Sequence, residues 1–296
     1  MSYVLETFEL TKEYARTKAV DGLSIKVREG EIYGFVGKNG AGKTTLIRMI
    51  LGLTRETSGS YRLFEQEHVH IARSRIGSLV ERPAIYKNMS ARDNLSIICT
   101  LLGKDKGCID GLLEMVGLEN TGKKKSADFS LGMKQRLGLA IALIGDPDFL
   151  VLDEPLNGLD PKGIVEIREL LLSLKEKGKT IFISSHMLGE LEKIATCYGI
   201  IASGHLVEEI TAEELSAKCG IRTVVKTSDP GKAMALLKKH LPDRELVAEK
   251  NRVIISDEVE DIGQITSELF SAGITVKGIS TDENSKEDYF IRRMEE

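Results

Sequence analysis

The sequence contains no long hydrophobic run, although 42% of its 296 residues are hydrophobic. Because a membrane-spanning helix needs about 20 consecutive apolar residues, we expect no such helix in this chain. The first residues also lack the basic segment followed by an apolar segment that is typical of a signal peptide. These two absences predict a globular protein of the cytosol.

Cysteine is scarce, and no charge of one sign dominates. The four thiols, Cys99, Cys108, Cys197 and Cys219, are scattered without the spacing of a metal site, so we interpret them as ordinary thiols in a reducing compartment. The formal net charge is −4, from 41 basic and 45 acidic residues. This balance argues against a general nucleic-acid binder, and we expect no nucleic acid among the partners.

A glycine-rich segment fits the phosphate-binding pattern G-x-x-x-x-G-K-[ST] at every fixed position. An apolar segment at 32–36 precedes it, and apolar residues at helical spacing follow it, so the motif lies between a predicted buried strand and a predicted helix. Glycines allow the tight turn, and the backbone N–H groups at the start of the helix bind phosphate. Within this segment, Lys43 can reach the β- and γ-phosphates and Thr44 can bind Mg²⁺. We therefore expect a nucleotide site at Gly37, Lys38, Asn39, Gly40, Ala41, Gly42, Lys43, Thr44 and Thr45.

Two further strands are predicted to end in polar residues. Residues 149–152 are apolar and lead to Asp153 and Glu154; residues 180–185 form a similar strand that leads to His186. In α/β sheets, ligands bind at the carboxyl ends of parallel strands, so these side chains are candidates for the nucleotide site. Adjacent residues of a strand point to opposite sides, which predicts that one acid faces the metal and the other a water molecule.

Two other candidates have a plain structural explanation on their own. Ser130 precedes an apolar helix through Leu143, where it can act as an N-cap or as part of an anion site. Tyr14 lies in a polar link at 11–16, where it is either an exposed loop residue or a platform for a purine ring. The residues alone favour the loop interpretation for Tyr14.

Changes in the hydrophobic pattern along the sequence divide the chain into segments. Residues before Gly30 indicate antiparallel β-structure, and residues 83–145 indicate a helical subdomain. After 212 the expected order is β-α-β-β-α-β, which is typical of a ferredoxin-like fold, and no phosphate, metal or nucleophile motif occurs there. The expected strands cover 221–226, 245–248, 252–256 and 276–279, the helices cover 230–241 and 259–272, and a short helix covers 289–294.

Together these segments resemble the nucleotide-binding subunit of an ABC transporter over residues 1–212. The segment at 37–45 is similar to the Walker A loop, 149–154 to Walker B, and 130–136 to the ABC signature. Residues 157–160 are similar to the D-loop, which ends at Asp160; His186 is similar to the switch histidine and Tyr14 to the adenine-stacking aromatic residue. The resemblance implies an ABC-type P-loop NTPase domain at 1–212, with antiparallel and helical subdomains, followed by a small α+β domain at 213–296.

Several positions depart from the family pattern. The usual signature is Leu-Ser-Gly-Gly-Gln. Here Ser130 and Gly132, the groups expected to touch phosphate, are retained, but the residues around them differ from that pattern. At the Q-loop position, which is normally glutamine, the aligned residue is Glu81, and a carboxylate there could bind Mg²⁺. These variants and the C-terminal extension look most like the ATP-binding subunits of bacitracin and lantibiotic-export systems.

The resemblance also implies a mechanism and partners. Each ATP would lie between the Walker A loop of one copy and the signature of another, so a chain with one of each is expected to form a homodimer. Lys43 would neutralise developing charge, Thr44, Asp153 and Glu81 would hold Mg²⁺, Glu154 would polarise the attacking water, and His186 would hold the γ-phosphate. The hydrolysis of ATP would power a separate polytopic permease at the inner face of the cell membrane, in peptide-antibiotic export or resistance.

Two alternatives from other classes remain at this stage. One is a non-transport ABC ATPase that acts in DNA repair or on ribosomes; such proteins carry long coiled coils or two cassettes in one chain, and this sequence has neither. The other is a soluble regulator that uses ATP as a switch and binds a small ligand through its C-terminal domain.

Overall fold

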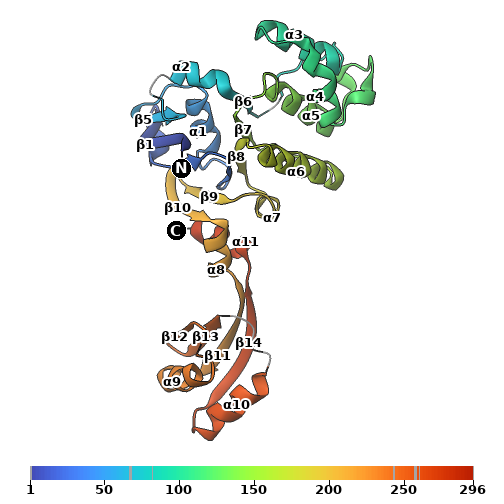
Figure 1. Cartoon of the computed structure of the whole chain (residues 1–296). Coiled ribbons are helices and arrows are strands. Elements are labelled where there is room, and N and C mark those ends of the chain that lie inside the picture. Colours follow the sequence, from blue (N-terminus) through green and yellow to red (C-terminus); the bar gives the residue numbers. More distant parts are fainter. Residues whose placement is uncertain are drawn as a thin grey trace. The chain divides into compact units, whose positions relative to one another are not determined.

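The computed structural model describes residues 2–66, 69–81, 83–242, 244–256, 259 and 261–295. The chain divides into two compact units, residues 1–212 with 292–296 and residues 213–291 (Figure 1). No helix among these described residues is long and apolar enough to cross a membrane. The sequence predicted a second domain from 213 to 296, whereas in the structure residues 292–296 belong to the first unit.

A six-stranded sheet forms the centre of the first unit, in the order β10-β9-β4-β8-β7-β6. Strands β6, β7, β8, β4 and β9 run parallel, and β10 pairs antiparallel with β9. Every residue of β4, β7 and β8 is buried, which explains why these strands are apolar almost throughout. The strands are β4 (Ile32–Val36), β6 (Ile76–Leu79), β7 (Phe149–Asp153), β8 (Thr180–Ser185), β9 (Cys197–Ala202) and β10 (His205–Thr211).

An antiparallel sheet precedes and flanks this centre, as the alternating N-terminal sequence predicted. Strand β1 pairs with β2, β3 and β5. Side chains from these strands, from β4, β7 and β8, and from the helix α1 (Lys43–Ile50) form one buried cluster. The strands are β1 (Tyr3–Tyr14), β2 (Thr17–Leu23), β3 (Lys26–Arg28) and β5 (Ser58–Leu63).

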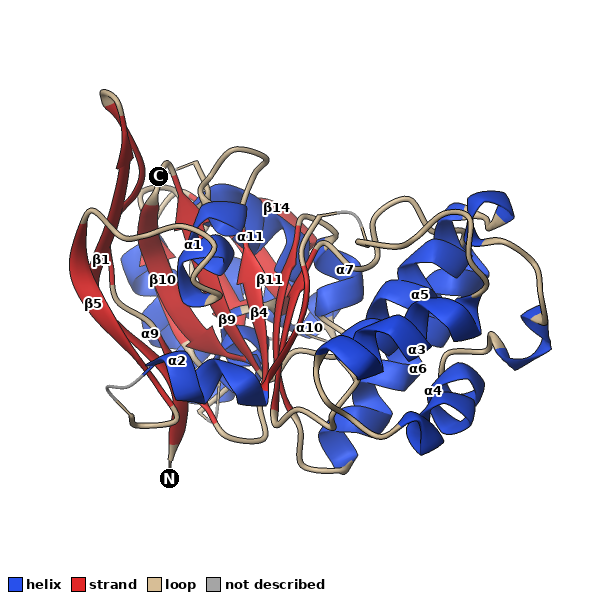
Figure 2. Cartoon of the chain, turned by 90° about the horizontal axis from the view of Figure 1, so that it is seen from above, coloured by secondary structure: helices blue, strands red, loops and turns tan. Residues whose placement is uncertain are grey.

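Helices dominate residues 83–145, as expected, and gather at one end of the first unit (Figure 2). Ser130 is the N-cap of α5 and accepts a hydrogen bond from the backbone N–H of Met133 at 3.2 Å. The helices of this unit besides α1 are α2 (Val69–Ala72), α3 (Ala91–Leu101), α4 (Ile109–Met115), α5 (Leu131–Ala142), α6 (Pro161–Glu176) and α7 (Leu188–Leu191). Short 3-10 turns cover Arg73–Arg75, Lys106–Cys108, Glu119–Thr121 and Ser126–Asp128.

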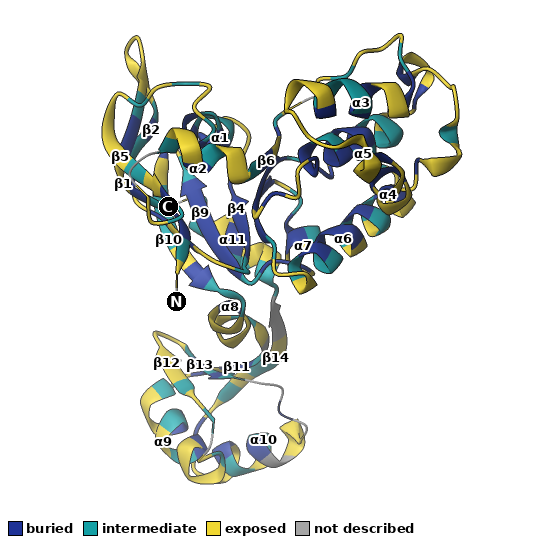
Figure 3. Ribbon diagram, turned by 45° about the horizontal axis from the view of Figure 1, so that its top comes forward, coloured by how far each residue is buried: buried dark blue, intermediate teal, exposed yellow. Residues whose placement is uncertain are grey.

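The second unit follows the predicted order of strands and helices. Its four strands form an antiparallel sheet in the order β12-β13-β11-β14 (Figure 3). Its core includes Val225, Val253 and Leu237. The strands are β11 (Gly220–Thr227), β12 (Leu246–Glu249), β13 (Arg252–Ser256) and β14 (Val276–Asn284), and the helices are α9 (Pro230–His240) and α10 (Ile262–Ser271). The helices α8 (Ala212–Lys218) and α11 (Lys286–Arg293) lie where the chain passes from one unit to the other.

The chain end is attached to the first unit by two ion pairs. Arg293 Nε donates to Glu208 Oε2 at 2.8 Å, and Lys38 Nζ lies 3.3 Å from Glu295 Oε1. These contacts bring the last described residue beside the glycine-rich loop.

Candidate functional site

The loop after β4 has the conformation that a phosphate-binding loop requires. Gly40 and Gly42 lie in the left-handed region, with φ of 83° and 111°. A Cβ at Gly42 would lie 2.3 Å from the carbonyl oxygen of Ala19, and one at Gly37 would lie 2.7 Å from the carbonyl oxygen of Ile201. At Gly42, both the backbone conformation and the nearby carbonyl of Ala19 require glycine. At Gly37, the nearby carbonyl of Ile201 requires it.

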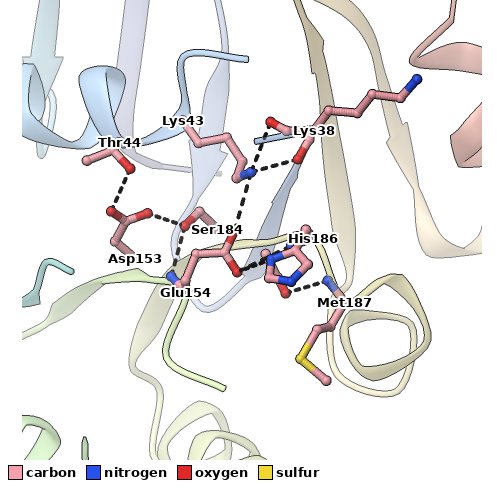
Figure 4. Close-up of polar contacts among 10 residues, drawn as sticks. Lys38, Lys43, Thr44, Asp153, Glu154, Ser184, His186 and Met187 are labelled. Atoms are coloured by element: carbon pink, nitrogen blue, oxygen red, sulfur yellow. Dashed lines mark hydrogen bonds and ion pairs between the residues drawn. The ribbon is translucent and has the colours of Figure 1, made fainter. Parts of the chain in front are cut away.

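Lys43, the first residue of α1, lies inside this loop. Its side chain is only 6% exposed, and Nζ donates to the carbonyl oxygen of Gly37 at 2.6 Å (Figure 4). The same ammonium group lies 3.3 Å from Glu154 Oε1. A buried ammonium ion held by carbonyl oxygens at the start of a helix is a strong binding group for phosphate oxygens.

Thr44 and the carboxyl end of β7 form a second part of the site. Thr44 Oγ1 donates to Asp153 Oδ2 at 2.8 Å, and Ser184 Oγ donates to Asp153 Oδ1 at 2.6 Å. Asp153 is 2% exposed and pairs in the sheet with Ser184 of β8. The hydroxyl groups of Thr44 and Ser184 thus hold the two oxygens of the buried Asp153 carboxylate beside the start of α1.

Glu154 turns away from Asp153 because the strand ends between them. Its φ is 51°, in the left-handed region, and its N–H lies 3.0 Å from Ser184 Oγ, which accepts the hydrogen bond. The Glu154 carboxylate has Lys43 on one oxygen and His186 Nδ1 at 2.8 Å from the other (Figure 4). The carboxylate therefore lies between the ammonium group of the loop and the imidazole that follows β8.

A cavity of about 620 Å³ opens beside these groups. Its lining includes Thr44, Asp153 and Glu154. Leu131, Lys134 and Gln135 of α5 line it as well, and Glu81 forms part of the wall. The Glu81 carboxylate does not contact Thr44 or Asp153; its Oε1 lies 2.5 Å from Arg48 Nη2.

Four of the predicted site residues lie outside the network of Lys43, Thr44, Asp153, Glu154 and His186. Ser130 caps α5, Gly132 lies in the first turn of the same helix, and Asp160 caps α6 by accepting from the N–H of Gly163 at 3.3 Å. Tyr14 is not in a loop: it is the last residue of β1, 45% exposed, with Lys12 Nζ 5.0 Å from its ring centre. The polar residues around Tyr14 suggested a link because the strand is exposed there.

The remaining loop positions surround a smaller hollow. Asn39, Gly40, Gly42, Thr44 and Thr45 line it together with Lys43 and Glu154. Ala41 is buried, and its carbonyl oxygen accepts from the N–H of Gly204 at 3.0 Å. Lys38 points outward to Glu295. The loop thus presents glycine backbone and the Lys43 side chain to the hollow.

The donor set at Thr44 and Asp153 fits a hard divalent cation. A hydroxyl and a carboxylate oxygen lie within one hydrogen bond of each other, and Mg²⁺ prefers oxygen ligands. Among the residues that the structure describes, no cluster of three or more His, Cys, Asp or Glu side chains could hold a metal ion.

Ser184, Gln135 and Arg48 were not predicted as site residues. Ser184 contacts both acids, Gln135 is 4% exposed and lines the cavity, and Arg48 holds Glu81. The signal for Ser184 was its place at the end of a buried strand, one strand away from Asp153. Nothing in the local sequence around Arg48 indicates its partner, because that partner lies 33 residues away.

Comparison with known proteins identifies the family. Residues 20–157 match the family model described as ABC transporter. The chain is 44% identical over 298 residues to the bacitracin transport ATP-binding protein BcrA of Bacillus licheniformis, covering 99% of this chain and 97% of that protein. It is 44% identical to the lantibiotic transport ATP-binding protein SrtF of Streptococcus pyogenes, covering 70% of this chain and 90% of that protein.

A solved structure, of an ATP-binding subunit of an ABC transporter, is similar in fold. Its TM-score is 0.66 at 26% identity, covering 73% of this chain and 92% of that one. The fold, the ordered loop and the network around Asp153 and Glu154 agree with these sequence relationships. The chain therefore belongs to the ATP-binding proteins of the ABC transporter family, which are ATPases.

Proposed function

We propose that this chain is the ATP-hydrolysing subunit of an exporter of peptide antibiotics such as bacitracin or lantibiotics. The observation that carries the proposal is the network in which Lys43 and His186 hold Glu154 while Thr44 and Ser184 hold Asp153. Similarity to BcrA along nearly the whole chain supports the transport class. It also counts against a repair ATPase or a soluble regulator.

In this proposal Lys43 binds the β- and γ-phosphates and offsets the charge that develops during transfer to water. Thr44 and Asp153 would hold Mg²⁺, and the ion would help to neutralise the charge of the phosphates. Glu154 accepts the proton of the attacking water, and its contacts with Lys43 and His186 keep its carboxylate in place. His186 uses Nδ1 for Glu154, which leaves Nε2 for the γ-phosphate.

The signature residues would act on the nucleotide of a second copy. Ser130 and Gly132 begin a helix whose first backbone N–H groups are suited to phosphate, and one chain supplies one glycine-rich loop and one signature. A homodimer with two ATP molecules at its interface uses both. Asp160 lies at the start of α6, where the D-loop would meet the partner, and Tyr14 would stack on the adenine.

We infer that the second unit is a ferredoxin-like accessory domain, since its β-α-β-β-α-β order and its antiparallel sheet are those of that fold. We also infer that the chain works in the cytoplasm at the inner face of the membrane, bound to a separate permease. This location follows from the transport role, since the described helices offer no span for a translocation path.

The transport role can be tested in the source organism by replacing Glu154 with Gln on the chromosome. We expect sensitivity to bacitracin or to a lantibiotic to rise to that of a strain lacking the gene, because the exporter loses its energy supply. Glu119→Gln, an exposed carboxylate in the helical region, serves as the control and should leave resistance unchanged. Resistance that persists in the Glu154→Gln strain, with ATP hydrolysis abolished in the purified variant, would contradict the export role.

A further inference from the structure

Arg48 and Thr44 lie on the same face of α1, because residues four positions apart are neighbours on a helix. Thr44 belongs to the proposed Mg²⁺ site, and Arg48 lies one turn further along, displaced by about 6 Å along the axis. Arg48 Nη2 lies 2.5 Å from Glu81 Oε1. The helix that begins in the phosphate loop therefore also holds the side chain at the Q-loop position.

Glu81 lines the same cavity as Thr44 and Asp153, two residues beyond the end of β6. Its φ is 55°, a left-handed conformation that costs a residue with a Cβ free energy. The sequence predicted that its carboxylate lies at the metal, and the structure brings it to the cavity wall, on Arg48. Its side chain is 57% exposed, so few other contacts fix its direction.

The charge of this carboxylate matters because ATP carries several negative charges. A carboxylate near the phosphates repels the nucleotide when no metal is bound, and the same carboxylate attracts a divalent cation. An arginine in contact with the carboxylate offsets the repulsion and competes for the oxygen that a metal would use. The net effect of this position on ATP and on the cation therefore depends on both Arg48 and Glu81.

We propose that Arg48 is a positioning residue for Glu81: it holds the carboxylate at the cavity wall and so limits its action on the nucleotide and its metal. This inference rests on the proposed ATP and Mg²⁺ site. In this inference the Arg48–Glu81 ion pair offsets the repulsion between the Glu81 carboxylate and the phosphates, so that a glutamate can occupy the Q-loop position.

The test is a double-mutant cycle with Arg48→Gln, Glu81→Gln and the double variant. ATP binding is measured by calorimetry in excess EDTA, so the readout does not depend on hydrolysis. Arg48→Gln releases the carboxylate and should weaken metal-free ATP binding about fivefold, the scale of one added charge at short range in a partly solvated cleft. Glu81→Gln should bind metal-free ATP as well as or better than the wild type.

The decisive quantity is the coupling between the two changes. If Arg48 acts through Glu81, Arg48→Gln should have less than about a twofold effect in the Glu81→Gln background. The Mg²⁺ concentration for half-maximal hydrolysis should fall in Arg48→Gln, because the freed carboxylate can bind the metal, and should rise in Glu81→Gln. Arg48→Lys preserves a cation and should stay close to the wild type in both readouts.

A matched ion pair at the opposite end of β6 provides the control. Arg75 precedes β6, Asp148 precedes β7, and their side chains are 45% and 50% exposed, against 42% and 57% for Arg48 and Glu81. Arg75→Gln and Asp148→Asn should leave metal-free ATP binding unchanged. Thermal unfolding of each variant checks for damage to the fold, which should be small because exposed pairs add little stability.

Equal effects of Arg48→Gln in both backgrounds would overturn the inference, since Arg48 would then act only as a distant positive charge. An unchanged affinity in Arg48→Gln would overturn it as well. Failure of the wild-type protein to bind ATP would instead refute the proposed function. The two failures are therefore distinguished within one set of titrations.

Discussion

Two adjacent acids differ in their surroundings, and this difference supports their separate roles. Asp153 ends a buried strand and accepts from two hydroxyl groups, whereas Glu154 lies in a left-handed turn between Lys43 and His186. The sequence predicted that both acids belong to the carboxyl end of the strand and point to opposite sides. The structure separates them because the strand ends at Asp153.

Glu154→Gln should cut the steady-state rate of ATP hydrolysis by about a hundredfold or more, the scale of a lost general base, while ATP binding persists. The amide keeps the shape of the side chain but cannot take a proton from water. A phosphate-release assay and ATP calorimetry on the purified variant measure the two quantities. Hydrolysis near the wild-type rate would remove Glu154 from this role.

At this scale the motifs predict a set of site residues, but they do not predict the contacts between the side chains. The fixed positions of the glycine-rich loop give Lys43 and Thr44 without reference to the rest of the chain. The position of the Glu81 carboxylate depends on Arg48, which is distant in sequence, and no local pattern encodes that contact.

Among the elements, the buried strands of the central sheet were predicted well because each is a short apolar segment. Exposed edges were predicted less well: β14 extends to Asn284, beyond the expected end at Ile279, since its outer half is polar and pairs with β11. The helix α8 was not predicted. Its seven residues offer one buried side chain, Leu215, so no apolar face marks it.

The helix α3 allows a test of local stability in the helical subdomain. Ser90 and Asp93 form a capping box, in which each side chain bonds to the other residue's backbone N–H. Ser90→Ala should lower the free energy of unfolding by about 1 kcal/mol, a typical loss for an N-cap. Urea denaturation followed by circular dichroism measures it, and an unchanged midpoint would show that the cap adds nothing.

The same box predicts a pH dependence. Hydrogen bonds from the Ser90 side chain and backbone lower the pKa of Asp93 below its usual value. A lowered pKa in the folded state means that the stabilisation is present above the unfolded pKa and is lost as the pH falls. The destabilisation by Asp93→Asn should therefore be largest near neutral pH and shrink below about pH 4. Glu114→Gln, an exposed carboxylate on α4, should not show this trend.

For the whole molecule, changes in the hydrophobic pattern of the sequence predicted two units. They did not predict that the last residues pack with the first unit. Residues 292–296 belong to the first unit, where Arg293 pairs with Glu208 and Glu295 with Lys38. Such contacts join residues that are 85 and 257 positions apart. Periodicity and motif spacing carry no information about them.

The central claim is that one copy provides the glycine-rich loop and another the signature for each ATP. The direct measurement is light scattering coupled to size exclusion on Glu154→Gln, with ATP and Mg²⁺ or with ADP, over a range of protein concentrations. We predict a dimer with ATP and a monomer with ADP, because in the proposed dimer the γ-phosphate would connect Lys43 of one copy to Ser130 of the other. A monomer at every concentration, under conditions in which calorimetry shows saturation with ATP, would contradict the account.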